Sequence, residues 1–483
     1  MLNNSVTKQV FWFSLSSYLG VVIGVISTLF IYPNNPEFLG IIRTVESYSQ
    51  IIFPIILIGA SQALVHFYPT LTPENKNRLF LYSLYSVVVN SVLLLGCVAL
   101  LFSVFDFEYQ NLVWIAFPIG FSIALNEVFK RQSLNLQKIA YPTFFEKIIP
   151  KVTLPLIFIL LAWQYISDKR GLWLFAVSYF LITLLTGIYT VRKDKTQWDS
   201  RFRTIFNSIS KKEYFRYSLY AFTGSLGSLL AFRIDTLMLG YLGYSMSEIG
   251  IYNLGAMVAA TLIIPATGIF AINSPVISEL VKENRLQKLS VKYKENAKLL
   301  FAIGALLYCS MLLGIYDLFS LLPAKDNLLQ SIPVLLVLGL GVVVNMGTGF
   351  NSEIITYSKY YRFNVIAILV MIGLNISLNL FFVRGLDLGA IGVAYATLVS
   401  LTCFNVLKLV YIQQKMGINP FDKKYLFLLL IVLSITWLVY LLPNLESHLW
   451  NLIYKSGLAF VLNLALIYKL KLVYQLNNFK KFR

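Results

Sequence analysis

The feature that most constrains this chain is a series of long segments without charge. Neither Phe11–Tyr32 nor Leu79–Phe105 contains a single Asp, Glu, Lys or Arg. Runs of about 20 such residues are long enough to cross the hydrocarbon region of a bilayer as helices. Only 13% of all residues are charged, whereas a soluble domain has about 25%. Short alternating segments, typical of a membrane barrel, do not occur. The sequence therefore predicts an all-α polytopic membrane protein.

We predict fourteen transmembrane helices from the apolar runs. The first run is too long for a signal peptide, and "YPNNPEF" follows it in place of a small-residue cleavage site. The fourteen expected spans cover residues 10–32, 48–68, 79–103, 111–130, 144–164, 171–191, 217–241, 249–272, 299–322, 331–355, 363–383, 388–412, 425–442 and 450–470.

The basic residues orient these spans. If the N-terminus is cytoplasmic, 30 of the 40 Lys and Arg residues fall on the cytoplasmic side, five on the outer side and five within spans. Such a bias follows the positive-inside rule and predicts cytoplasmic N- and C-termini. The net charge of +18 is then a property of the membrane topology, and it does not indicate nucleic-acid binding.

The spans divide into two halves of six. "FLGIIRTVESYSQIIFP" (38–54) and "EIGIYNLGAMVAATLIIP" (248–265) both place a Gly-Ile pair 14 or 15 residues before a proline. Repeats of six spans start and end on the same side, so they are parallel repeats, related by an axis along the membrane normal. We expect an N-terminal half (1–191), a basic cytoplasmic linker (192–216), a C-terminal half (217–412) and an appended helical hairpin (425–470).

Three motifs carry a family resemblance. "LGAIGVAYATLVS" (388–400), "EIGIYNLGAM" (248–257) and "RIDTLMLG" (233–240) resemble the polysaccharide-export branch of the multidrug/oligosaccharidyl-lipid/polysaccharide exporter superfamily. The resemblance covers nearly the whole chain as an architecture. It implies a V-shaped bundle whose two halves enclose a central cavity. It also implies a Wzx-type flippase in the bacterial inner membrane.

The resemblance sets expectations about cargo and partners. Its cargo would be an undecaprenyl-diphosphate-linked oligosaccharide used for O-antigen, capsule or exopolysaccharide synthesis. Partners would be membrane lipids, with the polysaccharide polymerase and the chain-length machinery as further candidates. No cofactor is expected. The family shares no strict substrate-binding motif, so no residue role is carried over from it.

Two charges stand inside the seventh expected span. Arg233 and Asp235 each oppose insertion by roughly 2.5–3.5 kcal/mol, which offsets the gain from about ten large apolar residues. Residues two apart on a helix point about 200° apart, so the two side chains cannot simply pair with each other. We expect both to face protein or water in the outer half of the membrane. Either they form structural salt bridges, or one of them has a functional role: Arg233 binds diphosphate, or Asp235 carries a coupling proton.

Other embedded charges lie nearer the cytoplasmic side. Lys147 and Lys151 share one helix face. They either extend to the inner headgroups or receive the lipid diphosphate in a basic vestibule. Glu127 and Arg131, also four apart, are expected to form an intrahelical pair. Glu353 closes the tenth span and is a second candidate for ion coupling.

Several other functions remain to be compared with the flippase. A cation-coupled multidrug exporter would prefer an apolar cavity, and a lipid II flippase is a closer alternative. A membrane glycosyltransferase, polymerase or ligase needs a sizeable outer loop, but the longest expected here is 33–47. No nucleotide-binding loop occurs. The three cysteines lie in apolar runs, and the two histidines are far apart, so neither a disulfide framework nor a metal site is expected.

Overall fold

Most of the expected apolar spans correspond to helices in a computed structural model, which describes residues 19–105 and 108–477. The eighth span (249–272) is divided between the helices Met246–Thr261 and Ile264–Lys282, and the tenth (331–355) between Lys325–Gly347 and Asn351–Tyr357. No strand occurs in these residues. Ten of the described helices are long and apolar enough to cross a membrane, and eleven are if one bent pair is a single span. The fold is therefore the all-helical, multi-pass membrane architecture that was predicted. The count of fourteen stays a prediction, because ten or eleven helices meet this criterion and part of the first expected span lies outside the described residues.

The chain forms two compact units, 1–250 and 251–483. The linker 192–216 and the helix after it belong to the first unit. The predicted boundary between the two six-span repeats, at this linker, concerns internal symmetry and stays a prediction. The helices of the first unit are α2 (Pro36–Leu57), α3 (Ala60–Phe67), α4 (Pro73–Val104), α5 (Gln110–Asn135), α6 (Ala140–Ala162), α7 (Asp168–Asp194), α8 (Ile205–Ser208) and α9 (Lys211–Tyr241), preceded by a helical segment over Leu19–Asn34. The boundary between the units falls within α10 (Met246–Thr261).

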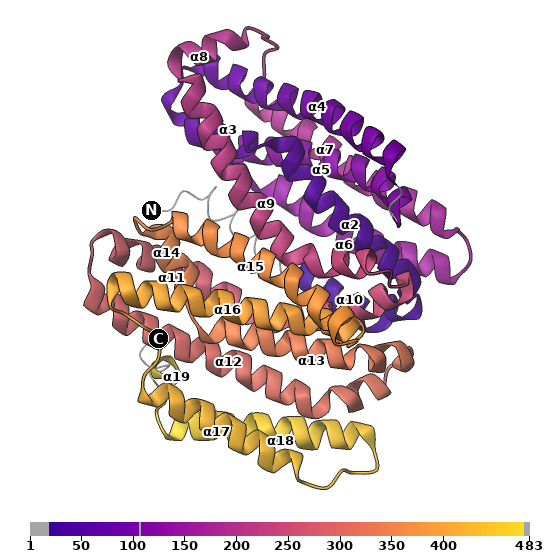
Figure 1. Cartoon of the computed structure of the whole chain (residues 1–483), viewed down its shortest axis with the longest axis vertical. Helices are drawn as coiled ribbons and strands as arrows, with labels where there is room; N and C mark the ends of the chain where they lie inside the picture. The colour runs from indigo at the N-terminus through magenta and orange to yellow at the C-terminus, as the bar shows by residue number, and fades with distance from the viewer. Residues whose placement is uncertain (1–18, 106–107, 478–483) are drawn as a thin grey trace. The chain divides into compact units, whose positions relative to one another are not determined.

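In the first unit, α2 and α5 form the centre of the packing. The long helix α2 packs on α5 and on α9, while α7 packs on α5 and α6. Figure 1 shows α4, α5 and α7 running side by side in the indigo-to-magenta part of the chain. This arrangement brings polar residues of α2, α6, α7 and α9 into one region of the unit.

The second expected span is a broken helix. α2 ends at Leu57, and Ile58 and Gly59 take positive φ angles of 42° and 77° before α3 begins. The two parts are bent by 49°. A side chain at position 59 would lie 2.0 Å from the carbonyl oxygen of Ser218 on α9. Glycine therefore serves the bend twice, through its backbone freedom and through its small size.

The helices of the second unit continue from the boundary. They are α11 (Ile264–Lys282), α12 (Leu286–Ser320), α13 (Lys325–Gly347), α14 (Asn351–Tyr357), α15 (Arg362–Leu380), α16 (Ala390–Met416), α17 (Lys423–Tyr440), α18 (His448–Lys469) and α19 (Tyr474–Asn477). α12 packs on α13 and α18, and α16 packs on α13 and α15.

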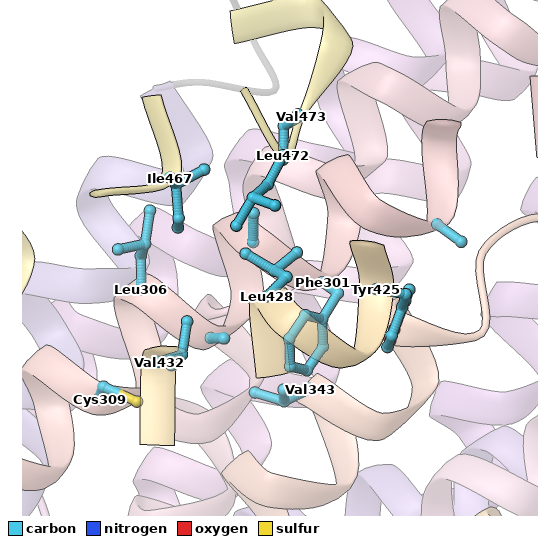
Figure 2. Packing of buried hydrophobic residues seen from close by; sticks show 13 residues of the cluster. Phe301, Leu306, Cys309, Val343, Tyr425, Leu428, Val432, Ile467, Leu472 and Val473 are labelled. Carbon is cyan, nitrogen blue, oxygen red and sulfur yellow. The ribbon is translucent and has the colours of Figure 1, made fainter. Parts of the chain in front are cut away.

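The expected C-terminal hairpin is formed by α17 and α18. Figure 2 shows how an apolar cluster fixes it to α12. Phe301 of α12 faces Tyr425 of α17, with ring centroids 5.0 Å apart. Leu428 and Ile467, one from each helix of the hairpin, are fully buried in the same cluster. The hairpin is therefore part of the core of the second unit.

Candidate functional site

The N-terminal part of α2 lies where an outer loop was expected. The amide oxygen of Asn35 accepts a hydrogen bond from the backbone N–H of Phe38 at 3.0 Å, so Asn35 caps the helix. Pro36 occupies the first turn, where its missing N–H has no cost, and Glu37 favours the positive end of the helix dipole. The prediction of a loop over residues 33–47 was therefore wrong. Glu37, Arg43 and Glu46 lower the hydropathy of this segment, so the segment does not look like a membrane helix although it is helical.

An ion pair lies inside this part of α2. Arg43 Nη1 lies 2.5 Å from Glu46 Oε2, and the two side chains are 14% and 12% exposed. Opposite charges three residues apart share a helix face. Because both groups are withdrawn from water, each compensates most of the charge of the other.

Arg233 of α9 joins this pair. Its Nη1 lies 3.9 Å from Glu46 Oε2, and its side chain is 31% exposed. The partner of Arg233 thus comes from another helix, as the geometry of span seven required. The group of Arg43, Glu46 and Arg233, which we call the arginine cluster, holds two guanidinium groups and one carboxylate. Arg233 is the more loosely held and the more exposed of the two arginines.

Tyr179 of α7 borders the arginine cluster. Its hydroxyl lies within electrostatic range of Glu46, Arg233 and Arg43, and also of Glu146 on α6. Four helices therefore contribute polar groups to this region. Asp235 is partly buried on α9, and helical geometry turns it away from Arg233.

A second set of charges joins α5 to α6. Arg131 Nε donates to Glu127 Oε1 at 2.7 Å, which confirms the expected intrahelical pair. Lys130 Nζ lies 2.6 Å from Glu127 Oε2 and 3.0 Å from Glu146 Oε2. Lys130 therefore bridges two carboxylates from neighbouring helices.

Lys147 and Lys151 lie on α6 beside this network. Both are partly buried, and each lies within electrostatic range of the next basic group, Lys147 of Lys130 and Lys151 of Lys147. The side chain of Lys151 covers Gly20, where an added Cβ would be 3.0 Å from its Cδ and Nζ. The two lysines thus place two ammonium groups on α6, with the carboxylate of Glu146 within electrostatic range of Lys147.

Glu353 lies in the second unit, on α14. Its electrostatic partner is Lys408 of α16, whose side chain is only 1% exposed. The ammonium group of Lys408 donates to Ser352 Oγ at 2.8 Å and lies 3.7 Å from the centroid of the Phe404 ring. A buried charge is stabilised there by a hydroxyl, a ring face and a nearby carboxylate.

Sequence reasoning singled out Arg233, Asp235 and Glu353 but missed several of their neighbours. Arg43 and Glu46 could have been found from the "NNPEF" helix start and their spacing of three. Lys408 was visible as a charge in an apolar run, yet nothing local indicated its partners. Groups of three or more side chains suited to a metal ion do not occur within residues 19–105 and 108–477.

Solved structures share this fold. A structure described as the lipid II flippase MurJ in an inward closed conformation superposes with a TM-score of 0.72 at 16% identity, covering 95% of this chain and 98% of that one. An inward-facing multidrug resistance MATE family transporter of the MOP superfamily gives 0.63 at 14% identity, covering 82% and 94%. At such identities the likeness concerns the fold alone. A comparison with curated proteins gave no match.

A family model gives the more specific result. The model described as "Polysaccharide biosynthesis protein" matches residues 35–315, which is more than half of the chain. The matched region includes α2 with Arg43 and Glu46, α6, and α9 with Arg233 and Asp235. With its all-helical fold shared with flippases and transporters of the MOP superfamily, the chain belongs to the polysaccharide biosynthesis protein family.

Proposed function

We propose that this protein is a flippase that moves an undecaprenyl-diphosphate-linked oligosaccharide across the bacterial inner membrane for surface polysaccharide synthesis. The observation that carries the proposal is the arginine cluster, in a chain of the polysaccharide biosynthesis family. Its two guanidinium groups share one carboxylate. The remaining positive charge suits a mobile anion better than a neutral drug.

Arg233 is the residue we assign to the diphosphate. A guanidinium group binds phosphate oxygens through two parallel N–H donors, which an ammonium group cannot reproduce. At 3.9 Å from Glu46, Arg233 can exchange a weak ion pair for a phosphate without leaving a bare carboxylate, because Arg43 continues to hold Glu46 at 2.5 Å.

Lys147 and Lys151 are proposed to meet the lipid diphosphate before it reaches Arg233. Lys147 and Lys151 add two positive charges along α6, of which only Lys147 lies within electrostatic range of the carboxylate of Glu146, and neighbouring ammonium groups attract a multiply charged anion over several ångströms. The alternative is that both lysines only extend toward the inner headgroups.

Asp235 and Glu353 are proposed to couple transport to an ion. Glu353 faces the buried ammonium group of Lys408, so loss or gain of one proton would change the charge of the pair. Asp235 lies two residues from Arg233, where a proton on its carboxyl group would change the field at the diphosphate site. The direction of coupling is open.

Two related functions compete with this proposal. A multidrug exporter coupled to cations would need less positive charge than the arginine cluster and α6 provide. A lipid II flippase would share the diphosphate chemistry and differ in the sugars. An enzyme that acts on the same lipid is less well supported, because the expected outer loop 33–47 is largely taken up by α2.

The localisation and partners are proposed with the function. We expect a multi-pass inner-membrane protein with cytoplasmic termini, which works beside the polysaccharide polymerase and the chain-length machinery. A cysteine placed at Asn478, outside the described residues, should resist an impermeant external reagent in intact cells. Labelling there would contradict the topology.

The function is tested with purified protein in liposomes that carry the lipid-linked oligosaccharide in one leaflet. An added pyrophosphatase that cannot cross the bilayer measures how much substrate reaches the other leaflet. Arg233→Lys should retain normal protein yield but lower the transport rate about tenfold, as expected for a loss of about 1.4 kcal/mol from a bidentate contact. Arg170→Lys, at an exposed position of α7, is the matched control. Equal rates in both variants would remove the diphosphate role from Arg233.

A cellular experiment distinguishes the competing functions. Deletion of the gene should let lipid-linked oligosaccharide accumulate in the inner leaflet while surface polysaccharide disappears. Altered drug resistance with unchanged polysaccharide would favour the exporter. Accumulation of lipid II would favour the third function.

A further inference from the structure

The linker between α7 and α9 is fixed to the first unit by polar contacts. Arg78, near the start of α4, donates from Nε to Asp199 Oδ2 at 2.9 Å and from Nη1 to Thr204 Oγ1 at 3.0 Å. The side-chain amide of Asn75 donates to Ser208 Oγ at 3.2 Å. We call residues 195–210 the linker shelf. It is held at both ends by one turn of α4 and is therefore an ordered part of the unit.

Apolar contacts fix the inner side of the shelf. Ile205 and Ile209 are buried. The ring of Tyr82 meets Phe202 and Phe206 edge-on, with centroids 5.6 Å apart in each pair. These large side chains face the unit, so the outer side of the shelf is left to its polar residues and to Trp198.

Most of the exposed charge of the linker, residues 192–216, is positive. Of its three acidic residues, Asp199 is held by Arg78 and Arg201, Asp194 accepts hydrogen bonds from Gln132 and Thr196, and only Glu213 is exposed. Hydrogen bonds from Arg201 and Arg78 hold the pKa of Asp199 well below its usual range, so it stays ionised. The eight basic side chains are all exposed: Arg192, Lys193, Lys195, Arg201, Arg203, Lys211, Lys212 and Arg216.

Trp198 stands on the outer side of the shelf. It is 84% exposed, the highest value for a large apolar side chain among the described residues. Tryptophan favours the interface between lipid and water, where its ring lies among the headgroups and its N–H remains hydrated. An ordered segment that presents Trp198 among basic residues therefore has the chemistry of a membrane-surface contact.

The position of the shelf matches this chemistry. It follows the last residue of α7 and is fastened to the first turns of α4. Both helices are long and apolar enough to span the membrane. Their two ends lie at one face of the bilayer, so the shelf lies at headgroup level.

We propose that the linker shelf binds the surface of an anionic bilayer, with Trp198 inserted among the headgroups and Arg192, Lys193, Lys195 and Arg203 on the lipid phosphates. The contact would fix the cytoplasmic end of the first unit to the leaflet. This inference does not depend on the cargo, so it stands or falls separately from the flippase proposal.

The test uses the full chain in nanodiscs of phosphatidylcholine alone or mixed with phosphatidylglycerol. Lipids brominated close to the headgroup quench nearby tryptophans, and subtraction of Trp198→Phe isolates one of seven tryptophans. Trp198 should be quenched in anionic discs, and high salt should reverse the quenching. It should stay open to aqueous acrylamide in zwitterionic discs.

Charge variants separate this contact from general basicity. Replacing Arg192, Lys193, Lys195 and Arg203 with Gln should weaken the contact by several hundredfold, at about fivefold per basic residue. Arg201 is left in place because it holds Asp199. The matched control replaces four exposed lysines of the second unit: Lys282, Lys288, Lys415 and Lys424.

Three results would overturn the proposal. Acrylamide could reach Trp198 equally in both kinds of disc. Bromolipid quenching could be equal with and without anionic lipid, or unchanged in the four-residue shelf variant. Protection from acrylamide without bromolipid quenching would show that protein covers Trp198. A single symmetric peak in size-exclusion chromatography confirms that each variant is folded.

Discussion

Alanine at Gly40 or Gly250 should disrupt a close backbone contact in the first unit. A Cβ at Gly40 would lie 1.8 Å from the carbonyl oxygen of Met246, and one at Gly250 would lie 1.8 Å from the carbonyl oxygen of Pro36. Each carbonyl belongs to the residue four positions before the opposite glycine. The contact is therefore reciprocal, and α2 and α10 touch backbone to backbone through both glycines.

The size of the effect follows from the distances. Ordinary contact begins near 3.4 Å, so one methyl group requires the helices to separate by about 1.6 Å at this point. Overpacking of this kind destabilises by about 1–3 kcal/mol. Since the obstructing atom is backbone oxygen, no rotamer change can relieve it, and the upper part of that range applies. Alanine returns at most about 1 kcal/mol through its better helix propensity.

The assay is thermal unfolding of purified protein in detergent, followed by loss of the monodisperse chromatographic peak. Gly40→Ala and Gly250→Ala should each lower the midpoint. The double variant should lose less than the sum, because a separation that admits one methyl group also admits the second. Gly96→Ala in α4 is the control, since a Cβ there meets no atom within 4 Å. Midpoints at the level of Gly96→Ala for both single variants would refute the reasoning.

Two further predictions concern charges of the second unit. Asp422→Asn should keep the hydrogen bond that caps α17, from Tyr425 N–H, but lose the 2.6 Å ion pair with Lys298. The free energy of unfolding should fall by about 1 kcal/mol. Asp422→Ala should lose both contacts and lower the free energy of unfolding further. Although burial opposes it, the hydrogen bond from Lys298 lowers the pKa of Asp422. The stabilisation by Asp422 is complete above the ordinary carboxyl pKa, about 3.9, and is lost as the pH falls through the lowered pKa of the folded state. The difference in unfolding midpoint between wild type and Asp422→Asn should therefore be constant from pH 5 to 8 and shrink below about pH 4. Lys408→Met should lower the unfolding midpoint, because it leaves the partly buried Glu353 without its counter-charge, and the ion dependence of transport should disappear in the protein that remains folded. A wild-type ion dependence in that variant would leave Lys408 a structural role only.

The spans could be predicted from the sequence because insertion into a bilayer depends on local composition. About 20 apolar residues favour a helix whatever they pack against. The break at Ile58–Gly59 could not be predicted in the same way. It depends on Ser218 of α9, whose carbonyl oxygen excludes a side chain at position 59, and that contact joins residues far apart in the chain.

The paired motifs around Gly40 and Gly250 were visible as a repeat. Their similarity indicated two related helices, and the structure adds that the two glycines pack against each other's helix. Sequence likeness alone gives no distance between repeats. Each glycine lies against a backbone carbonyl of the other segment, so a side chain at either position would be obstructed.

Only part of the candidate site, Arg233, could be predicted from the sequence, whereas Arg43 and Glu46 were missed. Arg233 drew attention because a charge in an apolar run is costly. Arg43 and Glu46 drew none, because their segment contains enough polar residues to resemble a loop. A hydropathy scale counts the cost of each charged residue separately. Arg43 and Glu46 compensate each other at 2.5 Å, so inserting a helix with both into the membrane costs less free energy than the sum over its residues suggests.

The embedded cations of the two units are stabilised in different ways, and the difference bears on their roles. Lys408 is fully buried, and its ammonium group is matched by Ser352, the ring of Phe404 and the charge of Glu353. Moving such a group would expose a charge to an apolar interior, so a change of protonation is easier there than a change of position. Arg233 is nearly one-third exposed and 3.9 Å from a carboxylate that Arg43 already holds. A guanidinium group in that state can bind an anion at little cost, and for this reason we propose Glu353 and Lys408 for ion coupling and Arg233 for the diphosphate.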